Sequence, residues 1–270
     1  MAVTERIGDH YILSSGRDGH ERLRLLCALH DPFSHPLLLD AGLCPGKTFV
    51  EFGCGLGCIS RWAATRGART TGVDLSHDHV AEASRLARDA GIEHVEFRQG
   101  SIYDSDLPEG TFDFAYCRFL LSHLSQPIAA MRTMAACLKP GGVLVCEEPD
   151  LKTIYSEPPS PAYAEGVERI LQLADSLALD FRFGARLALS ALSIGLEVQR
   201  ADAYQRHFLG GKEKGYWTWS FAEARPSLLS TSPSPAELDK CLSDMRKVDR
   251  DPRVMVGHAR MHQLLARKPS

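Results

Sequence analysis

The sequence predicts an α/β protein built on a doubly wound, mostly parallel sheet. Between residues 47 and 150, short runs of β-branched and aromatic residues alternate five times with segments of helical periodicity. This alternation is typical of a parallel sheet with crossover helices. A glycine-rich turn containing Gly53, Gly55 and Gly57 follows the first run, and Asp74 ends the second. A glycine turn and a carboxylate at the tips of neighbouring strands indicate a nucleotide or nucleoside site.

Length and composition limit the classes of protein to which this chain can belong. The 270 residues, 44% hydrophobic and 24% charged, suit one large domain or a domain with a cap. With a net charge of −3 and no long Lys/Arg run, no nucleic-acid partner is expected. No apolar stretch reaches about 18 residues, so no membrane span is expected. The sequence has no signal peptide pattern, so a cytoplasmic protein is expected. None of the eight cysteines forms a C-x-x-C pair, so we expect reduced thiols and no bound metal.

The first part of the chain, residues 1–46, is predicted to be a helical lid. A polar segment opens it, and a helix follows from Asp18 with leucines at helical spacing. Asp31-Pro32 should end that helix, because the residue before proline disfavours helical geometry. A second short helix is expected from Pro36 to Gly42.

Five strands and their helices make up the predicted core, residues 47–150. Ser76 is a good N-cap for the helix after the second strand. Residues 139–142 form a predicted tight turn before the fifth strand, which is expected to start at Val143. Ligands of such sheets bind beyond the carboxyl ends of the strands. The strands are expected at residues 49–52, 70–73, 95–97, 112–116 and 143–146, and the candidate ligand-binding residues just past them are Gly53, Asp74, Ser101, Arg118 and Glu148.

The remainder is predicted to be two further strands and several helices. Helical periodicity is clear near residues 163–177 and again at 185–194. Residues 196–204 alternate like a strand, and 255–267 read as a last, antiparallel strand. Ser234 opens a capping box for another helix.

The glycine turn discriminates between classes of cofactor. A dinucleotide site needs G-x-G-x-x-G, and Cys58 stands where that motif has its third glycine. The chain also lacks a Tyr-x-x-x-Lys pair, so a nicotinamide-dependent oxidoreductase is a remote alternative. Glu51 lies two residues before the turn. The pattern Glu51-x-Gly53-x-Gly55-x-Gly57 resembles motif I of the class I S-adenosylmethionine (SAM) dependent methyltransferases.

The resemblance extends along residues 47–150 and is strongest to small-molecule enzymes such as those of ubiquinone and menaquinone biosynthesis. Four further segments match: 72–76, 100–102, 112–124 and 138–142. The resemblance implies a Rossmann-like seven-stranded sheet, with the last strands at 196–204 and 255–267. It also implies a helical cap at 151–195 and 205–250, SAM as cofactor and S-adenosylhomocysteine as product. Many relatives have aspartate where this chain has Ser101.

The resemblance also implies which residues bind the cofactor. The predicted set combines the N-terminal lid, the glycine turn and the strand ends. It consists of Tyr11, Glu51, Gly53, Cys54, Gly55, Gly57, Asp74, Leu75, Ser101, Ile102, Arg118 and His123.

Catalysis in this reaction class is mainly orientation, because the methyl group is displaced in line and the reacting atoms must be held close together. A base helps when the acceptor is a hydroxyl or an activated carbon. His123 and Glu148, each just past a strand end, are the candidate bases. The alternatives are that His123 only packs beside the cofactor and that Glu148 is a solvated loop acid.

The acceptor is predicted to be a small, apolar or aromatic molecule, because aromatic residues crowd the predicted cap. Trp217 and Trp219 are its predicted contacts, and Arg182, between two phenylalanines, is a predicted anchor for an anionic group. O-, N- and C-methylation stay open, as does a homo-oligomer. A SAM-binding protein without methyl transfer is the second functional hypothesis.

Overall fold

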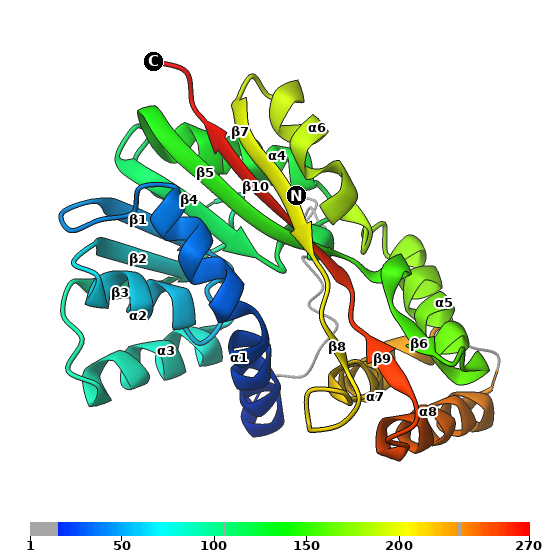
Figure 1. Ribbon diagram of the computed structural model, residues 1–270. Helices are drawn as coiled ribbons and strands as arrows, with labels where there is room; N and C mark the ends of the chain where they lie inside the picture. Colours follow the sequence, from blue (N-terminus) through cyan, green and yellow to red (C-terminus); the bar gives the residue numbers. More distant parts are fainter. Residues whose placement is uncertain (1–15, 105, 232–233) are drawn as a thin grey trace, which may run out of the picture.

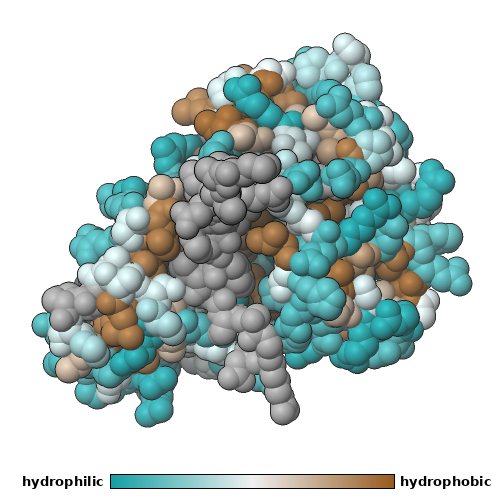
Figure 2. All heavy atoms as spheres, turned by 180° about the vertical axis from the view of Figure 1, so that it is seen from behind, coloured by the Kyte–Doolittle hydropathy of each residue, from teal (hydrophilic) through white to brown (hydrophobic). Residues whose placement is uncertain are grey.

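The computed structural model describes residues 16–104, 106–231 and 234–270. A large twisted sheet with helices on both faces forms one part, and a smaller group of helices and short strands lies beside its lower edge (Figure 1). No helix in these ranges has both the length and the apolar character needed to cross a membrane. On the face shown in Figure 2, hydrophilic residues predominate and apolar ones form small separate groups.

Seven strands make up the large sheet, in the order β3-β2-β1-β4-β5-β10-β7. The first five run parallel, whereas β10 is antiparallel to both of its neighbours. The predicted mostly parallel sheet with an antiparallel last strand is therefore confirmed. The strands are β1 (Thr48–Phe52), β2 (Arg69–Asp74), β3 (Val95–Gln99), β4 (Phe112–Arg118), β5 (Leu138–Asp150), β7 (Glu197–Tyr204) and β10 (Arg260–Arg267).

Amphipathic helices cover both faces of this sheet. On one face, α2 (Cys58–Thr65) buries Ile59 and Ala63, and the second half of α1 (Gly16–Asp40) packs beside it. On the other face lie α4 (Pro127–Cys137) and α6 (Leu187–Ser193). Along β2 and β3 runs α3 (His77–Asp89), whose N-cap Ser76 accepts a 3.3 Å hydrogen bond from the His79 amide, as predicted.

The first helix is longer than predicted. It continues through Pro32 and Pro36, so the expected end at Asp31 and the separate helix from Pro36 are wrong. A proline inside a helix removes one amide donor. Here the second half of the helix is retained because Leu37 and Leu38 are buried against the sheet, which outweighs local propensity.

The fifth strand also starts earlier than predicted. The expected turn at residues 139–142 lies within β5. The Gly141 amide donates to the Lys268 carbonyl and the Lys268 amide to the Gly142 carbonyl, each at 2.9 Å. These bonds extend the pairing with the chain end and incorporate the turn into the sheet edge.

We call α5 (Pro161–Ser176), α7 (Tyr216–Leu228), α8 (Pro235–Arg250) and a three-stranded sheet the cap. That sheet has the order β6-β9-β8, with β6 (Tyr155–Glu157), β8 (His207–Phe208) and β9 (Met255–Gly257). At Gly166, α5 and α8 approach closely, because a Cβ there would lie 2.8 Å from the Met245 sulfur.

The predicted cap needs two corrections to its boundaries and one to a helix N-cap. Residues 183–195 pack on the large sheet rather than in the cap, because Leu187 and Ala191 belong to its core. Residues 255–257 pair with the cap strands, not with the large sheet. Ser234 does precede α8, but its side chain makes no capping hydrogen bond.

Within the described ranges, three short 3₁₀ turns connect these elements: Leu121–His123, Leu151–Thr153 and Phe183–Arg186.

Candidate active site

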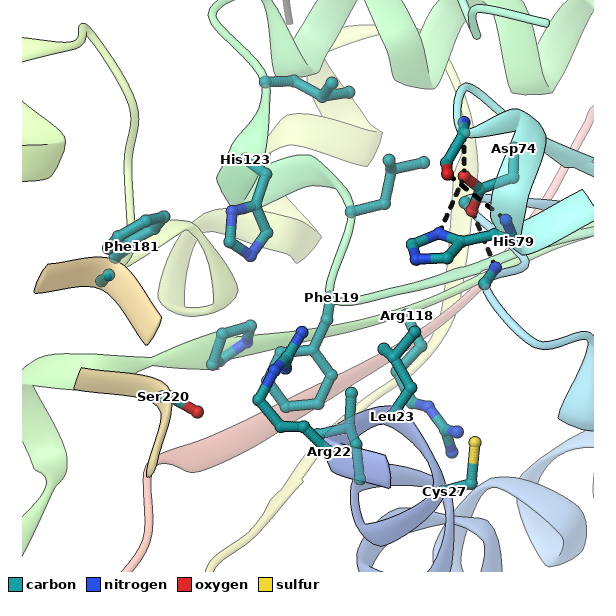
Figure 3. Close-up of a pocket in the computed structure, with 18 of the residues that line it drawn as sticks. Arg22, Leu23, Cys27, Asp74, His79, Arg118, Phe119, His123, Phe181 and Ser220 are labelled. Carbon is teal, nitrogen blue, oxygen red and sulfur yellow. Dashed lines mark hydrogen bonds and ion pairs between the residues drawn. The ribbon is translucent and has the colours of Figure 1, made fainter. Parts of the chain in front are cut away.

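A cavity of about 310 Å³ lies between the carboxyl ends of the parallel strands, α1 and the cap. Figure 3 shows Asp74 and His79 at one end and His123 and Phe181 at the other, with Arg22, Phe119 and Arg118 between them. The sheet side is polar in part, and the cap side is largely apolar. The cap side is formed by Leu151, Ile154, Tyr163, Gly166, Val167, Ile170, Phe181, Tyr216, Trp217, Ser220, Phe221, Ala224 and Met245.

The glycine turn forms the floor of the cavity. Gly53, Gly55 and Gly57 have φ values of 67°, 51° and 67°, in the left-handed region that favours glycine. A Cβ on Gly57 would lie 2.4 Å from the Phe97 ring, so no larger residue fits there without displacement. The turn leaves backbone exposed to the cavity beside Cys54, whose side chain is buried and which also lines the cavity.

Asp74 lies at the end of β2 and faces the turn. Its Oδ2 accepts a 2.8 Å hydrogen bond from the Gly55 amide, and its Oδ1 accepts a 2.9 Å bond from the Ser76 amide. The ring nitrogen Nδ1 of His79 lies 3.2 Å from Oδ1. A carboxylate has about four acceptor positions, so Asp74 retains capacity for a hydroxyl donor from the cavity.

Glu51 lines the cavity but is directed to the helix behind the turn. Its Oε2 accepts a 2.8 Å hydrogen bond from the Ser60 amide and a second bond from the Ser60 hydroxyl. Burial raises the pKa of Glu51 to about 8, although both bonds from Ser60 act to lower it. Glu51 therefore holds α2 against β1, beneath the glycine turn.

The end of the cavity near β2 and β3 contains Leu75, Ser101 and Ile102. Ile102 is buried, whereas Leu75 is 49% exposed at the rim. The Ser101 hydroxyl accepts a 3.2 Å hydrogen bond from the Tyr103 amide. An apolar side chain on either side of a hydroxyl is suited to a flat heteroaromatic group.

Arg118 ends β4 and connects it to α1. Its guanidinium forms a 2.8 Å ion pair with Asp31 and donates a 2.7 Å hydrogen bond to the Ser34 hydroxyl. Arg118 lines the cavity, but these bonds direct its charged end toward α1. The predicted contact between this side chain and the cofactor is thus limited to its apolar stem.

Glu148 is not placed as a base. Its side chain is fully buried, and it accepts hydrogen bonds from the amides of Leu120, Leu121 and Ser122 and from the Ser122 hydroxyl, at 2.8–3.2 Å. Burial raises its pKa to about 7, against the effect of these donors. The catalytic assignment from sequence is therefore corrected: Glu148 braces the turn that carries His123.

His123 is held at the cavity wall by that braced turn. Its ring packs edge-to-face against Phe181, with centroids 5.0 Å apart. Burial, and then the charge of Arg22, lowers the pKa of His123 to about 4. The imidazole is therefore neutral at physiological pH, the state in which a histidine accepts a proton.

The cap residues selected from sequence divide into two groups. Trp217 lines the cavity, but Trp219, two positions further along α7, does not. Trp219 instead packs with Leu25, Leu26 and Leu29 of α1. The prediction that Arg182 anchors the acceptor is also corrected, because this residue lies outside the cavity.

Arg182 points to the surface, where it pairs with Asp175 and Asp180. Its neighbour Phe181 lines the cavity instead. Tyr11, the predicted lid contact, lies outside the described residues.

The cavity lining also includes Arg22, Leu23 and Phe119. None of them is in the predicted set of site residues, although the segment Glu21-Arg22-Leu23 resembles a part that closes over SAM in related enzymes. Arg22 is 1% exposed and forms a 2.7 Å ion pair with Glu223. A signal was available, because Arg22 shares a helical face with Leu26 and Leu29, where a charge is unexpected. Phe119 has a φ of 54°, a strained conformation of the kind that gathers at functional sites and that the sequence did not reveal.

Comparison with known proteins agrees with this geometry. Residues 50–146 match the family model described as methyltransferase domain. The chain is 32% identical over 177 residues to the ubiquinone biosynthesis O-methyltransferase of Psychrobacter cryohalolentis, covering 64% of this chain and 66% of that one. It is 34% identical over 165 residues to the enzyme of the same name from Pseudomonas paraeruginosa, covering 59% and 68%. The chain thus spans about two thirds of the length of these relatives.

A solved structure extends the likeness to the fold of most of the chain. Geranyl diphosphate methyltransferase, in complex with GPP and sinefungin, superposes with a TM-score of 0.53 at 20% identity. The match covers 96% of this chain and 86% of that one. The positive-φ glycine turn and the carboxylate of Asp74 fit the cofactor that this family uses. The chain therefore belongs to the class I SAM-dependent methyltransferases.

Proposed function

We propose that this enzyme transfers the methyl group of SAM to a hydroxyl of a small, largely apolar or aromatic acceptor. The observation that carries the proposal is the division of one cavity into a polar sheet-side end and an apolar cap-side end. A nucleoside needs the first, and an apolar acceptor needs the second. O-methylation is chosen because the relatives at 32–34% identity are named O-methyltransferases.

Different residues of the chain are assigned to different parts of the cofactor. The Asp74 carboxylate is assigned to the ribose hydroxyls, and the backbone of the turn at Gly53 and Gly55 to the adjoining part of the nucleoside. Leu75 and Ile102 are assigned to the two faces of the adenine. When bound, SAM supplies an electrophilic methyl group on its sulfonium.

The aromatic lining favours an apolar acceptor at the cap side. Phe181 follows α5, whereas Trp217 and Phe221 lie one turn apart on α7, and together they form an aromatic wall at that end of the cavity. The Trp217 indole nitrogen is not exposed to the cavity, so this residue contributes its apolar ring to the wall.

His123 is assigned as the group nearest the acceptor hydroxyl. Its pKa is lowered to about 4, so the imidazole is neutral from pH 6 to 8 and has a free position for the hydroxyl proton, but it is a weaker base than an ordinary histidine. The in-line attack itself requires that the oxygen be held about 3–3.5 Å from the methyl carbon. Phe181 and the turn braced by Glu148 fix the imidazole for this purpose.

Replacing His123 by glutamine tests this role. If His123 accepts the proton, kcat should fall by about 10²–10⁴-fold, with the Kd for SAM little changed. The wild-type kcat should not reveal a histidine titration between pH 6 and 8, and should fall only as the pH approaches 4, where His123 becomes protonated. Stopped turnover assays across pH 4–9 check both points. A loss below fivefold would leave His123 as a packing residue.

Replacing Trp217 by alanine tests the acceptor wall. The variant should lose about tenfold or more in kcat/KM for the acceptor while SAM affinity stays near wild type, because an aromatic wall of the cavity is removed. Trp219→Ala is the matched control, since that indole lies outside the cavity. Equal losses in both variants would show that α7 acts through packing rather than through contact.

The function itself is tested by supplying labelled SAM and a panel of phenols that carry apolar substituents. Label should pass to the phenol oxygen, with one S-adenosylhomocysteine formed for each methyl transferred. The same phenols already methylated on oxygen are the controls and should receive none. Transfer to amines or carbon acids, with none to phenols, would overturn the O-methyl assignment.

A further inference from the structure

Two cysteines from different helices meet at the wall of the cofactor cavity. The sulfur atoms of Cys27, on α1, and Cys58, the first residue of α2, lie with a carboxylate oxygen of Asp31 within 4.8 Å of one another. Both thiols are partly buried, and both line the cavity, so small molecules that enter the cavity reach them. Figure 3 shows Cys27 beside Arg118 and close to Leu23.

The surroundings make the two thiols chemically unequal. Cys58 lies at the N-terminus of α2, and Arg61 lies 3.8 Å from its sulfur. The hydrogen bond from Cys27 lowers the pKa of Cys58, with Arg61 and Arg118 acting in the same direction. The same hydrogen bond and burial raise the pKa of Cys27. One thiol is thus disposed to be a thiolate and the other to keep its proton, as in reactive cysteine pairs.

The same three side chains are poorly suited to a metal ion. The Asp31 oxygen Oδ1 is already engaged by Arg118 in a 2.8 Å ion pair. The guanidinium groups of Arg118 and Arg61 place positive charge where a cation would have to sit. Two thiols and one ion-paired carboxylate also fall short of the four ligands of a structural zinc site.

We propose that Cys27 and Cys58 form a reversible disulfide that joins α1 to the glycine turn and controls exchange of the cofactor. The oxidant is a peroxide. The Cys58 thiolate attacks one peroxide oxygen and breaks the O–O bond, which gives a sulfenic acid and, after protonation, water. The Cys27 sulfur then displaces the sulfenic hydroxyl, and a second water leaves. The two thiols lose two electrons and two protons, and hydrogen peroxide becomes two molecules of water.

The position of α1 explains why this bond would matter. A Cβ placed on Gly55 would lie 3.7 Å from Leu23, so α1 lies directly over the turn. A disulfide requires a sulfur–sulfur distance of about 2.05 Å, shorter than any non-bonded contact between the two thiols. The bond would therefore hold α1 on the turn and slow entry and exit beneath it.

The other cysteines of the chain differ from this pair in access or in having a close partner. Cys117 and Cys146 are also paired, on adjacent strands β4 and β5, but both are fully buried. Burial, the largest cause, raises the pKa of Cys117 and keeps that thiol protonated, and neither sulfur is accessible to peroxide. Cys44 is exposed and is not one of the three side chains that meet at the cavity wall. Among the eight cysteines, Cys27 and Cys58 combine access, a close partner and an activating charge.

The test is oxidation of the full-length protein with a small molar excess of hydrogen peroxide, followed by peptide mass spectrometry without reduction. A Cys27–Cys58 cross-link, removed by dithiothreitol, is expected in the wild type and in the control variant Cys44→Ser. In Cys27→Ser the reaction should stop at oxidised Cys58, with no cross-link. A cross-link through other cysteines, or both thiols still free after oxidation, would overturn the proposal. So would zinc retained by the wild type and lost from Cys27→Ser.

The effect on exchange rests on the proposed function and is measured separately. Release of S-adenosylhomocysteine should be about tenfold slower from the oxidised than from the reduced protein, and dithiothreitol should restore it. Cross-linked protein that releases S-adenosylhomocysteine at the reduced rate would overturn the control of exchange. Failure of the reduced protein to bind S-adenosylhomocysteine at all would instead count against the proposed function.

Discussion

Asp74→Ala should weaken SAM binding by about 1.5–3 kcal/mol, or roughly 10- to 150-fold in Kd. The carboxylate is assigned to the ribose hydroxyls, and it also accepts hydrogen bonds from the Gly55 and Ser76 amides. Removing it therefore takes away a ligand contact and loosens the turn that forms the cavity floor. Isothermal titration calorimetry with SAM gives the Kd directly.

The control for this variant is Asp78→Ala. Asp78 lies in the first turn of α3, is about half exposed and faces His20 rather than the glycine turn. Its replacement should leave the Kd for SAM within about twofold, because a surface ion pair contributes little. If wild type and Asp74→Ala bound SAM with equal affinity, Asp74 would not be a cofactor-binding residue.

Glu148→Ala should destabilise the fold by roughly 3–5 kcal/mol, because three backbone amides and a hydroxyl lose their buried acceptor together. Urea unfolding followed by circular dichroism measures the loss. Turnover should fall as well, since His123 directly follows the residues that Glu148 holds. This effect is the largest that we expect from a residue outside the cavity lining.

Glu148→Gln distinguishes a bracing role from a catalytic one. Glutamine keeps a carbonyl oxygen for part of the network but cannot serve as a base. A brace predicts that stability and turnover fall together and that glutamine recovers part of both. If Glu148→Ala and Glu148→Gln both kept normal stability but lost turnover, Glu148 would instead have a catalytic role.

The sheet and the sheet-side end of the cavity were predictable because each depends on local sequence. The runs at Phe49–Phe52 and Thr70–Val73 have the residues of buried strands, and the glycines between them permit only a turn. The carboxyl ends of parallel strands meet at one edge, so Gly53 and Asp74 had to lie close together.

The errors arose where distant contacts override local preference. Pro32 and Pro36 predict a break, but burial of Leu37 and Leu38 against the sheet keeps α1 continuous. Glu148 lies near the end of β5 whether its side chain faces the cavity or the protein interior, and the sequence does not distinguish these two orientations.

The cap-side end of the cavity was the least predictable part. Arg182 and Phe181 are neighbours, and which of them lines the cavity depends on how the turn after α5 packs against His123. Arg22 reaches the cavity only because α1 crosses from the sheet to the cap, where it meets Tyr216. Contacts of this kind join residues nearly 200 positions apart, and no local pattern encodes them.

The central claim is that one cavity holds SAM on the sheet side and an apolar acceptor on the cap side. The most direct measurement is a crystal structure with S-adenosylhomocysteine and an apolar phenol bound together. The ribose should lie against Asp74, and the phenol should lie between His123 and Trp217 with its oxygen toward the cofactor sulfur. A nucleoside bound elsewhere, or a phenol outside the cap, would contradict the account.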